Sequence, residues 1–575
     1  MYEKLIIYTL IIVFNFSSII SHKCGTDLLI NKLNLTNNKN FVGENRRRLS
    51  DTFYPIRVKI DYTLLQNQNN RQIISNTNYQ NLKNNLDKIP EYLAKIISVS
   101  RETFNEQDLL KKINIFRISF KENIILWLFN FNCQYSNKIH FRISTFNYDI
   151  SSYDLIVYPV VDSYKEFVSD NVIAAASHCI LSSASGRPIV GMVLLNNNLN
   201  TKRDLEYYIK NSIFHEFFHI LGFNIEFFKE KNYVENNVAY LNTPKLLAKA
   251  KLHFGCDSMK GLRLENQGEK GSIGSHWDAR FMQGELMISE DYSEVVLSDM
   301  TLAFLEDLGY YKVNYYTGGL FRFGKNQGCS FLEKECVYSE GTLFSNEFCV
   351  EPGKAFCTGS HTSKGSCYIA EYRSALPTSF QYFSNPKVGG KVMTDYCPIS
   401  FYNKADDNYN YPMNCVYGKK EYSDEVIGSN SICFETSVNL NINTTACYKM
   451  SCDRTNKKII VYIGSQKIEC DGEQKIINVN SSDTLNCPDY NMVCTSSIWC
   501  NNMFECIDKQ SVTDENTYLY NTNYAQLKQM DNKKLNLYTS SKYSIQFGSN
   551  DNNIMVKYTW KNFIAQFILL IFAFM

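Results

Sequence analysis

Two histidines and a glutamate stand at a spacing that could hold a metal ion and activate water. They occur in the run His215-Glu216-Phe217-Phe218-His219. Histidines four residues apart lie on one face of a helix, where both imidazoles can reach the same Zn²⁺. A glutamate directly after the first histidine points to the open side of the metal, where it could take a proton from a bound water. The pattern predicts two zinc ligands, His215 and His219, and a general base, Glu216.

Histidine is scarce in this chain, which limits the choice of a third ligand. There are 8 histidines in 575 residues, and those that follow the motif are His253, His276 and His361. The metzincin pattern places its third histidine at position 225, where this chain has Ile225. Gly222 fits the glycine of that pattern, because it lets the chain turn sharply away from the metal. Either the third ligand comes from further along the chain or the metal site is incomplete, and a carboxylate is the alternative to a histidine.

The residues around the motif predict a helix behind a buried strand. The apolar run at 189–195 is typical of a buried strand and is ended by three asparagines. Residues 203–221 predict one helix, with an apolar stripe at every fourth position and Gly222 at its end. Residues 57–62 and 155–161 also predict strands. Residues 81–99 predict a helical segment, in which Pro90 causes a kink or a fresh start.

At this point the chain resembles leishmanolysin, a family of surface metallopeptidases that inserts a long segment between the glycine and the third histidine. The residues that carry the resemblance are Asn242–Lys245, His253–Cys256, Gly261, Leu264–Glu265, Gly274–Arg280, Gly284–Met287 and Thr301–Tyr310. The resemblance extends from about Cys24 to Cys506 and is strongest from Ile189 to Cys329. It implies that His276 is the third zinc ligand and that Met287 forms the Met-turn, with His253 as a weaker alternative for the ligand.

The resemblance also implies a fold and an activity. The expected fold is α+β, a metzincin-like zinc peptidase domain with an active-site helix, followed by a disulfide-rich C-terminal region. One Zn²⁺ per chain would acidify a water and polarise the scissile carbonyl, and Glu216 would move the proton. The partners would be protein or peptide substrates, and an extended substrate would pair with an edge strand, for which Gly191–Leu195 is the candidate. Degradation of surface proteins and cell adhesion are the expected roles.

The start of the chain predicts secretion and latency. Residues 1–21 combine Lys4, an apolar run and small residues, as in a secretory signal peptide. Residues 22–48 are polar and are expected to form a propeptide. Cys24 stands apart from the other cysteines in this segment. In families that resemble this one, a propeptide cysteine caps the zinc as a thiolate, so the resemblance implies that Cys24 displaces the catalytic water and acts as a latency switch. Pairing with another cysteine, or a free thiol, is the alternative.

The end of the chain predicts an anchor in the outer leaflet of the cell-surface membrane. Residues 551–575 end in an apolar stretch that is too short for an ordinary spanning helix. Small residues, a polar spacer and a terminal apolar tail together are typical of a GPI-attachment signal. Ser549 and Asn550 are the candidate attachment sites, and a short tail helix is the alternative. The expected location is the extracellular face of the membrane, with release from it as a further possibility.

Cysteine density divides the rest of the chain. Of the 19 cysteines, 15 lie between Cys329 and Cys506, which agrees with an oxidising compartment but leaves their pairing open. The expected segments are an N-terminal catalytic subdomain at 49–222, a central subdomain at 223–325, a Cys-rich domain at 326–510 and a stalk at 511–550. N-glycosylation sequons stand at Asn34, Asn443 and Asn480.

Charge excludes one class of partner and leaves one alternative function. With 59 basic and 58 acidic residues the formal net charge is +1, and no basic stripe indicates a nucleic-acid partner. The alternative to an active zinc peptidase is a catalytically silent adhesion or recognition protein that uses the Cys-rich region. Loss of Glu216 or of a ligand would favour that alternative, and all of these residues are present.

Overall fold

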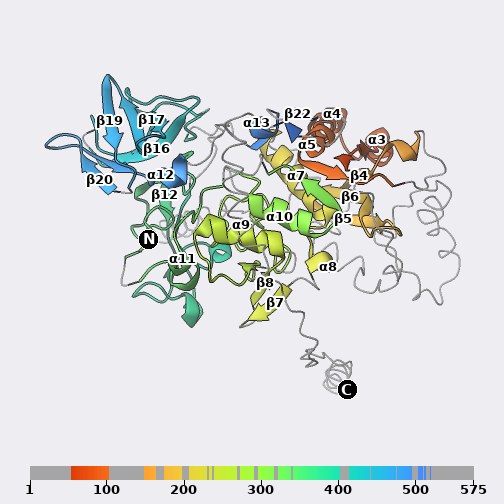
Figure 1. Cartoon of the computed structure of the whole chain (residues 1–575), viewed down its shortest axis with the longest axis horizontal. Helices are drawn as coiled ribbons and strands as arrows, with labels where there is room; N and C mark the ends of the chain where they lie inside the picture. The colour runs from red at the N-terminus through yellow and green to blue at the C-terminus, as the bar shows by residue number, and fades with distance from the viewer. Residues whose placement is uncertain are drawn as a thin grey trace, which may run out of the picture.

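The computed structural model places most of the chain between residues 53 and 519 (Figure 1). It describes residues 53–102, 148–162, 174–196, 206–228, 232–235, 238–268, 272–290, 295–315, 321–338, 341–401, 413–416, 418–440, 442–473, 475–494, 503–508, 511–512 and 518–519. The expected signal peptide, propeptide and anchor lie outside these residues, as do Cys24, Asn34, Ser549 and Asn550. No helix within the described ranges is both long enough and apolar enough to cross a bilayer.

A four-stranded sheet forms the centre of the N-terminal part, in the order β2-β4-β6-β5. Its strands are β2 (Val58–Ile60), β4 (Leu155–Asp162), β6 (Pro188–Asn196) and β5 (Ala174–Leu181). β2, β4 and β6 run parallel, and β5 runs antiparallel to β6. Every residue of β4 and β6 is buried, and this burial explains their unbroken apolar runs.

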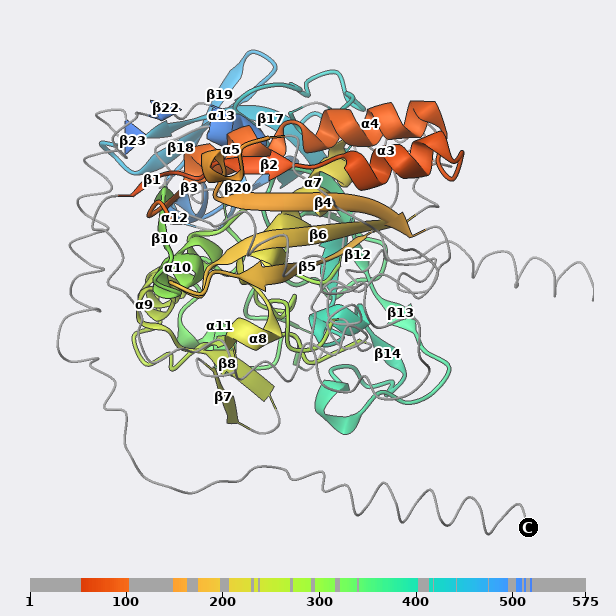
Figure 2. The same ribbon diagram turned by 90° about the vertical axis from the view of Figure 1, so that its right-hand side faces the viewer.

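Helices near the N-terminus cover this sheet, as Figure 2 shows for the orange-red ribbons beside β4. They are α3 (Thr63–Asn70), α4 (Asn76–Leu86) and α5 (Ile89–Ile96). Ser75 caps α4 by accepting a hydrogen bond from the backbone of Asn78. Pro90 lies in the first turn of α5, where a missing N–H costs no hydrogen bond, so the fresh start expected there is confirmed.

The expected helix at 81–99 is wrong at its C-terminal end, where residues 97–99 form a strand. This strand, β3 (Ile97–Val99), lies between β1 (Tyr54–Pro55) and β10 (Tyr311–Val313) in a small antiparallel sheet. All three residues of β3 are buried, and β-branched side chains suit a strand that is covered on both faces. Through β10, the central part of the chain returns to the N-terminal part.

Helix α7 (Glu206–Leu221) packs directly against the sheet. A Cβ placed on Gly191 of β6 would lie only 2.5 Å from Cγ2 of Ile220, so a glycine is needed for this close approach. The helix that was expected at 203–221 and the strand expected at 189–195 are therefore neighbours in space.

The central part of the chain adds short helices and a second small sheet. Its helices are α8 (Ile225–Phe228), α9 (Pro244–Phe254) and α10 (Asp299–Asp307), and its sheet contains β7 (Asn232–Glu235), β8 (Val238–Leu241) and β9 (Leu262–Arg263). α9 and α10 pack against each other. Much of the remainder is irregular, including the segment that carries His276 and Met287.

The Cys-rich part is built on short strands and disulfides. It contains α11 (Cys329–Glu333), β11 (Ala355–Cys357), β12 (Lys364–Tyr368), β13 (Ala370–Glu371), β14 (Val388–Gly389), β15 (Ile399–Phe401), α12 (Tyr490–Val493) and α13 (Met503–Asp508). The 3₁₀ helices of the chain are η4 (Ile150–Ser152), η7 (Thr378–Phe380) and η8 (Val392–Thr394). A final hairpin pairs β22 (Ser511–Val512) with β23 (Tyr518–Leu519).

A six-stranded antiparallel sheet ends this part, in the order β19-β18-β17-β16-β21-β20. Its strands are β16 (Ser431–Thr436), β17 (Thr444–Asp453), β18 (Lys458–Ile463), β19 (Gln466–Cys470), β20 (Lys475–Asn478) and β21 (Thr484–Cys487). Figure 1 places these blue strands at the opposite end of the molecule from α3 and α4.

Seven disulfides connect cysteines within the described residues. They are Cys256–Cys329, Cys336–Cys397, Cys349–Cys367, Cys357–Cys433, Cys415–Cys447, Cys452–Cys494 and Cys470–Cys487. The expected disulfide-rich C-terminal region is confirmed, and the mixture of helices and strands confirms the α+β class. One hydrophobic core extends from Ile56 to Ile507 and includes residues of all three parts of the chain, while the six-stranded sheet has a core of its own.

Candidate metal centre

Helix α7 carries the first two histidines of the site, and both are buried. His215 is 7% exposed and His219 is fully buried. His276, from the irregular segment that follows α9, is also fully buried. These three side chains form the one group of potential metal ligands found in the described part of the chain, with all ligand atoms within 4.8 Å of one another.

The imidazoles meet through their Nε2 atoms. Nε2 of His219 lies 2.9 Å from Nε2 of His215 and 3.2 Å from Nε2 of His276. Two nitrogens bound to one tetrahedral Zn²⁺ would lie roughly 3.3 Å apart, given zinc–nitrogen bonds of about 2.0–2.1 Å. The spacing of the three rings therefore matches what a zinc ion requires.

Backbone carbonyls hold the other nitrogen of each ring. Nδ1 of His215 lies 2.5 Å from the carbonyl of Leu286, and Nδ1 of His219 lies 2.6 Å from that of Phe223. Nδ1 of His276 lies 3.1 Å from the carbonyl of Ser272. Because a carbonyl only accepts, each Nδ1 carries the proton and donates.

The Nε2 lone pairs therefore all point toward one small space. Three lone pairs at this separation repel one another, and a cation between them removes the repulsion. A metal-bound histidine commonly donates its second nitrogen to a carbonyl, which fixes the tautomer and the ring orientation. The residues present fit a bound Zn²⁺ on both counts.

Burial also keeps the rings neutral. It lowers the pKa of His215 from 6.5 to about 4 and that of His276 to about 3. The pKa of His219 falls well below its usual value, first through burial and then through the neighbouring histidines. A neutral imidazole is the form that binds a metal, so the three rings are ready to bind one near neutral pH.

The C-terminal end of α7 is fixed by a glycine and an asparagine. Gly222 has φ +123°, and a Cβ there would lie 2.8 Å from Cδ1 of Leu308, so no other residue fits the turn. The side chain of Asn224 donates to the carbonyl of His219 over 3.0 Å and accepts from the backbone of Glu226. These bonds satisfy groups that the end of a helix leaves open.

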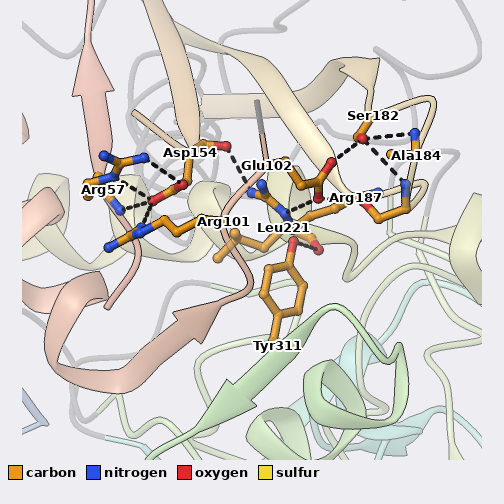
Figure 3. A network of polar contacts seen from close by, with 10 residues as sticks. Arg57, Arg101, Glu102, Asp154, Ser182, Ala184, Arg187, Leu221 and Tyr311 are labelled. Atoms are coloured by element: carbon orange, nitrogen blue, oxygen red, sulfur yellow. Dashed lines mark hydrogen bonds and ion pairs between the residues drawn. The ribbon is translucent and has the colours of Figure 1, made fainter. Parts of the chain in front are cut away.

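A polar network at one end of the sheet supports the same helix end (Figure 3). The hydroxyl of Tyr311 donates to the carbonyl of Leu221, the last residue of α7, over 2.9 Å. Burial raises the pKa of Tyr311, so the hydroxyl keeps its proton. Nearby, buried Arg187 pairs with Glu102 at 3.3 Å and donates to the carbonyl of Asp154. Arg57, Arg101 and Ser182 complete the network.

The third histidine lies in a loop that packs against α8. Ile225, at the position where a metzincin carries its third histidine, begins α8, and its Cδ1 lies 3.5 Å from where a Cβ on Gly274 would stand. The backbone of Glu265 donates to the carbonyl of His276 over 2.9 Å. His253 is not part of the group, because its Nε2 bonds the carbonyl of Phe323 at 2.8 Å.

The segment around Met287 contacts the histidines through its backbone. Met287 is fully buried, and the residue before it, Leu286, supplies the carbonyl that accepts from His215. The carbonyl of Met287 accepts from the backbone of Trp277, which follows His276. The segment that was expected to form a Met-turn therefore contacts both α7, which carries His215, and the loop that carries His276.

Glu216 is buried beside the first histidine and is 2% exposed. It follows His215 on α7, so the helix delivers a carboxylate together with the imidazoles.

Asn443 and Asn480 are both exposed, as a glycosylated asparagine must be. The side chain of Asn480 accepts from the backbone of Ser482 and Asp483, in the turn between β20 and β21.

The structure corrects the expected substrate strand. Gly191–Leu195 belongs to β6, which is paired on one side with β4 and on the other with β5, so its backbone has no free edge. Within the described part of the chain, β5 lies at one end of this four-stranded sheet, next to β6. The sequence could not show this, because the position of a strand in a sheet depends on its pairing with distant segments.

A sequence model of the leishmanolysin family matches residues 137–500, which is more than half of the 575 residues. The chain belongs to the leishmanolysin family. This confirms the resemblance seen in the residues around His276 and Met287. The leishmanolysin family is one of zinc metallopeptidases, and the chain carries a three-histidine group within the matched range.

Individual members of the leishmanolysin family are distant relatives. A leishmanolysin homolog of Crithidia fasciculata is 28% identical over 365 residues, which cover 57% of this chain and 54% of the relative. Leishmanolysin of Leishmania tropica is 32% identical over 241 residues, or 40% of this chain and 36% of the relative. A leishmanolysin-like peptidase of Caenorhabditis briggsae is 26% identical over 437 residues, or 60% and 66%. The chain thus spans about half the length of the curated relatives it matches.

Proposed function

We propose that this protein is a zinc endopeptidase that holds one Zn²⁺ through His215, His219 and His276. The observation that carries the proposal is the convergence of three buried, neutral imidazoles on one point, with Nε2 separations of 2.9 and 3.2 Å. Membership of a metallopeptidase family supports the same assignment. The adhesion alternative has no observation in its favour, since the ligands and the glutamate are all in place.

The reaction follows from the residues around the metal position. Zn²⁺ held there would supply Lewis acidity, which lowers the pKa of a water and polarises the scissile carbonyl. Glu216 would accept the proton of that water and later donate it to the leaving amine. The carbonyls of Leu286, Phe223 and Ser272 keep the three rings in place while this happens.

An extended substrate would bind along the sheet above α7. β5 replaces Gly191–Leu195 as the candidate for pairing, because β6 has no free edge and β5 lies against the helix that carries Glu216. Backbone pairing with an edge strand gives affinity with little sequence preference, and side-chain pockets then select among substrates. The proposed substrates are proteins or peptides in an extended conformation.

The proposed location is extracellular, on the cell surface. Seven disulfides support an oxidising compartment. Latency through Cys24, glycans at Asn34, Asn443 and Asn480, and a GPI anchor at Ser549 or Asn550 stay predictions. They can be tested on secreted protein by mass spectrometry and by release with a phospholipase.

The test compares the secreted protein with two variants on a library of peptides. We expect cleavage that stops when a zinc chelator is added and returns with zinc. Glu216→Gln should retain one zinc per chain but lose at least a thousandfold in kcat, because the metal stays and the base is gone. His276→Ala should lose zinc, because this substitution removes the third ligand. A zinc-loaded, propeptide-free protein that cleaves nothing would contradict the proposed function, and unchanged zinc binding in His276→Ala would contradict this ligand set.

A further inference from the structure

One fully buried carboxylate near the metal centre accepts hydrogen bonds from three residues of the chain. Glu285 accepts from the backbone N–H of Met287 at 2.5 Å and from that of Ser298 at 3.0 Å. It also accepts from the hydroxyl of Ser298 at 2.9 Å and from that of Thr301 at 2.5 Å. Three of these donors meet Oε1 and the N–H of Met287 meets Oε2, so both oxygens of the carboxylate act as acceptors.

These donors belong to structures that meet behind the histidines. Ser298 is the N-cap of α10 and also accepts from the backbone of Thr301. The hydroxyl of Thr301 accepts from Nε1 of Trp277 at 2.8 Å, and Trp277 directly follows His276. Glu285 is therefore connected through one hydroxyl to the residue beside the third histidine.

The backbone next to Glu285 touches the histidines directly. The carbonyl of Leu286 accepts from Nδ1 of His215 at 2.5 Å. The carbonyl of Met287 accepts from the backbone of Trp277 at 2.9 Å. The N–H of Met287 and the carbonyl of Leu286 belong to the same peptide group. Because the Glu285 carboxylate accepts from this N–H, it fixes the orientation of that carbonyl.

We propose that Glu285 is a positioning residue that orients His215 and His276 for metal binding from outside the ligand set. It acts on His215 through the carbonyl of Leu286 and on His276 through Thr301 and Trp277. The inference rests on the proposed function, in that the three histidines are taken to hold zinc. Outer partners of this kind, which orient ligands without touching the metal, commonly change metal affinity by about 10–100-fold when they are removed.

The chemistry of the four donors explains why a carboxylate is needed. Glutamine has nearly the same shape, but its amide nitrogen donates and cannot accept. In Glu285→Gln, at least one donor among Met287, Ser298 and Thr301 would face another donor in a site closed to water. A buried donor without an acceptor is costly, so the turn would shift until that donor finds a partner.

A second buried glutamate offers a matched control far along the chain. Glu425, in the Cys-rich part, accepts from the backbone of Glu421, Tyr422 and Cys447 and from Nζ of Lys364. Like Glu285, it is fully buried and accepts four hydrogen bonds, three of which come from backbone N–H groups. Glu425→Gln makes the same chemical change without touching the segments that hold His215 and His276.

The experiment measures metal binding by the full-length secreted protein. Zinc affinity is determined by competition with a chelator, and the ligand field by the absorption spectrum after replacement of zinc with Co²⁺. We expect Glu285→Gln to weaken zinc binding by about 10–100-fold and to change the Co²⁺ spectrum. Glu425→Gln should bind zinc within about twofold of the original protein even if it unfolds more easily.

A second variant keeps the test decisive if Glu285→Gln fails to fold. Thr301→Val removes a single hydroxyl between Glu285 and Trp277, and we expect a smaller change of the same kind in zinc affinity and Co²⁺ spectrum. If the folded variants bind zinc as Glu425→Gln does, with an unchanged Co²⁺ spectrum, Glu285 is merely structural and the inference is overturned. Metal binding is measured without peptide hydrolysis, so the two proposals are tested separately. A protein that binds zinc but cleaves nothing would contradict the proposed peptidase activity and leave the role of Glu285 standing.

Discussion

At the scale of single residues, burial keeps several histidines neutral both inside and outside the metal centre. The pKa of His361 is lowered to about 4, and that of His253 to about 3, in each case chiefly by burial. Nδ1 of His361 bonds the carbonyl of Cys433 at 3.0 Å, so this ring is a structural part of the Cys-rich region. Its neutrality has a consequence for stability in acid.

We expect His361 to make the folded protein less stable as the pH falls. Its pKa is about 4 in the folded protein and about 6.5 in an unfolded chain, so below pH 6.5 the unfolded chain takes up a proton that the folded protein refuses. The stability that depends on neutral His361 is complete above pH 6.5 and is lost as the pH falls toward 4.

The variant His361→Asn tests this expectation. Asparagine tolerates the positive φ of 58° at this position and does not titrate. Between pH 7 and pH 4.5, the variant should lose about 2 kcal/mol less free energy of unfolding than the original protein. Both proteins keep the same metal ligands, so the difference between them isolates His361. Equal losses in both proteins would show that this histidine is not a source of acid sensitivity.

The functional residues were predictable where side-chain type and spacing carry the information. His215, Glu216 and His219 follow from a motif, and His276 follows from a resemblance to a family. The carbonyls of Leu286, Phe223 and Ser272 could not be predicted, because every residue has one and the sequence does not show where it points. Glu285 stood inside a matching run, but its type alone did not reveal that it would be buried with four donors.

At the scale of elements, the contact between α7 and β6 controls where the metal centre lies. Gly191 leaves just enough room for Ile220, which follows the second histidine on the helix. A methyl group at position 191 would have to push the helix away from the sheet or force Ile220 into another rotamer. Overpacking of this kind usually costs about 1–3 kcal/mol.

A double-mutant cycle can measure this contact. We expect Gly191→Ala to lower the free energy of unfolding by about 1–3 kcal/mol. Ile220→Ala removes the atoms that would clash, so the double variant should be more stable than the sum of the two single effects by about 1 kcal/mol or more. Gly341→Ala serves as the control, because a Cβ there has its nearest neighbour at 3.7 Å. Additive effects at positions 191 and 220 would mean that the two residues do not compete for space.

Elements with a long, uniform pattern were the ones that the sequence predicted well. The strands at β4 and β6 and the helix α7 agree with their expected ranges to within a few residues. The pattern did not show that the chain changes from helix to strand at Ile97, because the apolar residues there suit both. Nor could it show which strand lies at an edge, since that depends on pairing between distant segments.

At the scale of the whole molecule, the Cys-rich part is attached to the loop that carries the third histidine. Nε of Arg263 lies 2.7 Å from the carboxylate of Asp278, and Nη2 of Arg263 lies 2.7 Å from that of Asp395. Asp278 stands two residues after His276, whereas Asp395 belongs to the Cys-rich part. Lys391 of the same part pairs with Glu290 at 3.3 Å.

Loss of the Arg263 bridge should destabilise the whole protein. Arg263→Leu leaves two buried carboxylates without their shared counter-charge, and we expect a loss of about 3–5 kcal/mol in the free energy of unfolding. Lys458→Leu removes an exposed pair with Glu469, which solvent screens, and should leave the free energy of unfolding nearly unchanged. Calorimetry of the two zinc-loaded variants compares them directly. Similar shifts in Tm for both variants would show that the bridge contributes no more than a surface pair.

The number of cysteines predicted a disulfide-rich region but not which cysteines pair. Fifteen cysteines allow very many pairings, and the actual ones depend on which strands become neighbours. Cys357, for example, pairs with Cys433 across 76 residues of sequence, while Cys349 pairs with Cys367 only 18 residues away. The sequence holds no local signal for either choice.

The bond between Cys256 and Cys329 makes a covalent ring of the segment that contains His276 and Met287. A protein that hydrolyses peptide bonds exposes its own loops to the same chemistry. A single cut inside this ring would leave both new ends attached to one molecule, so the third histidine could not diffuse away from α7. Such a nick would be invisible on a gel run without a reductant and would appear only once the disulfides were reduced.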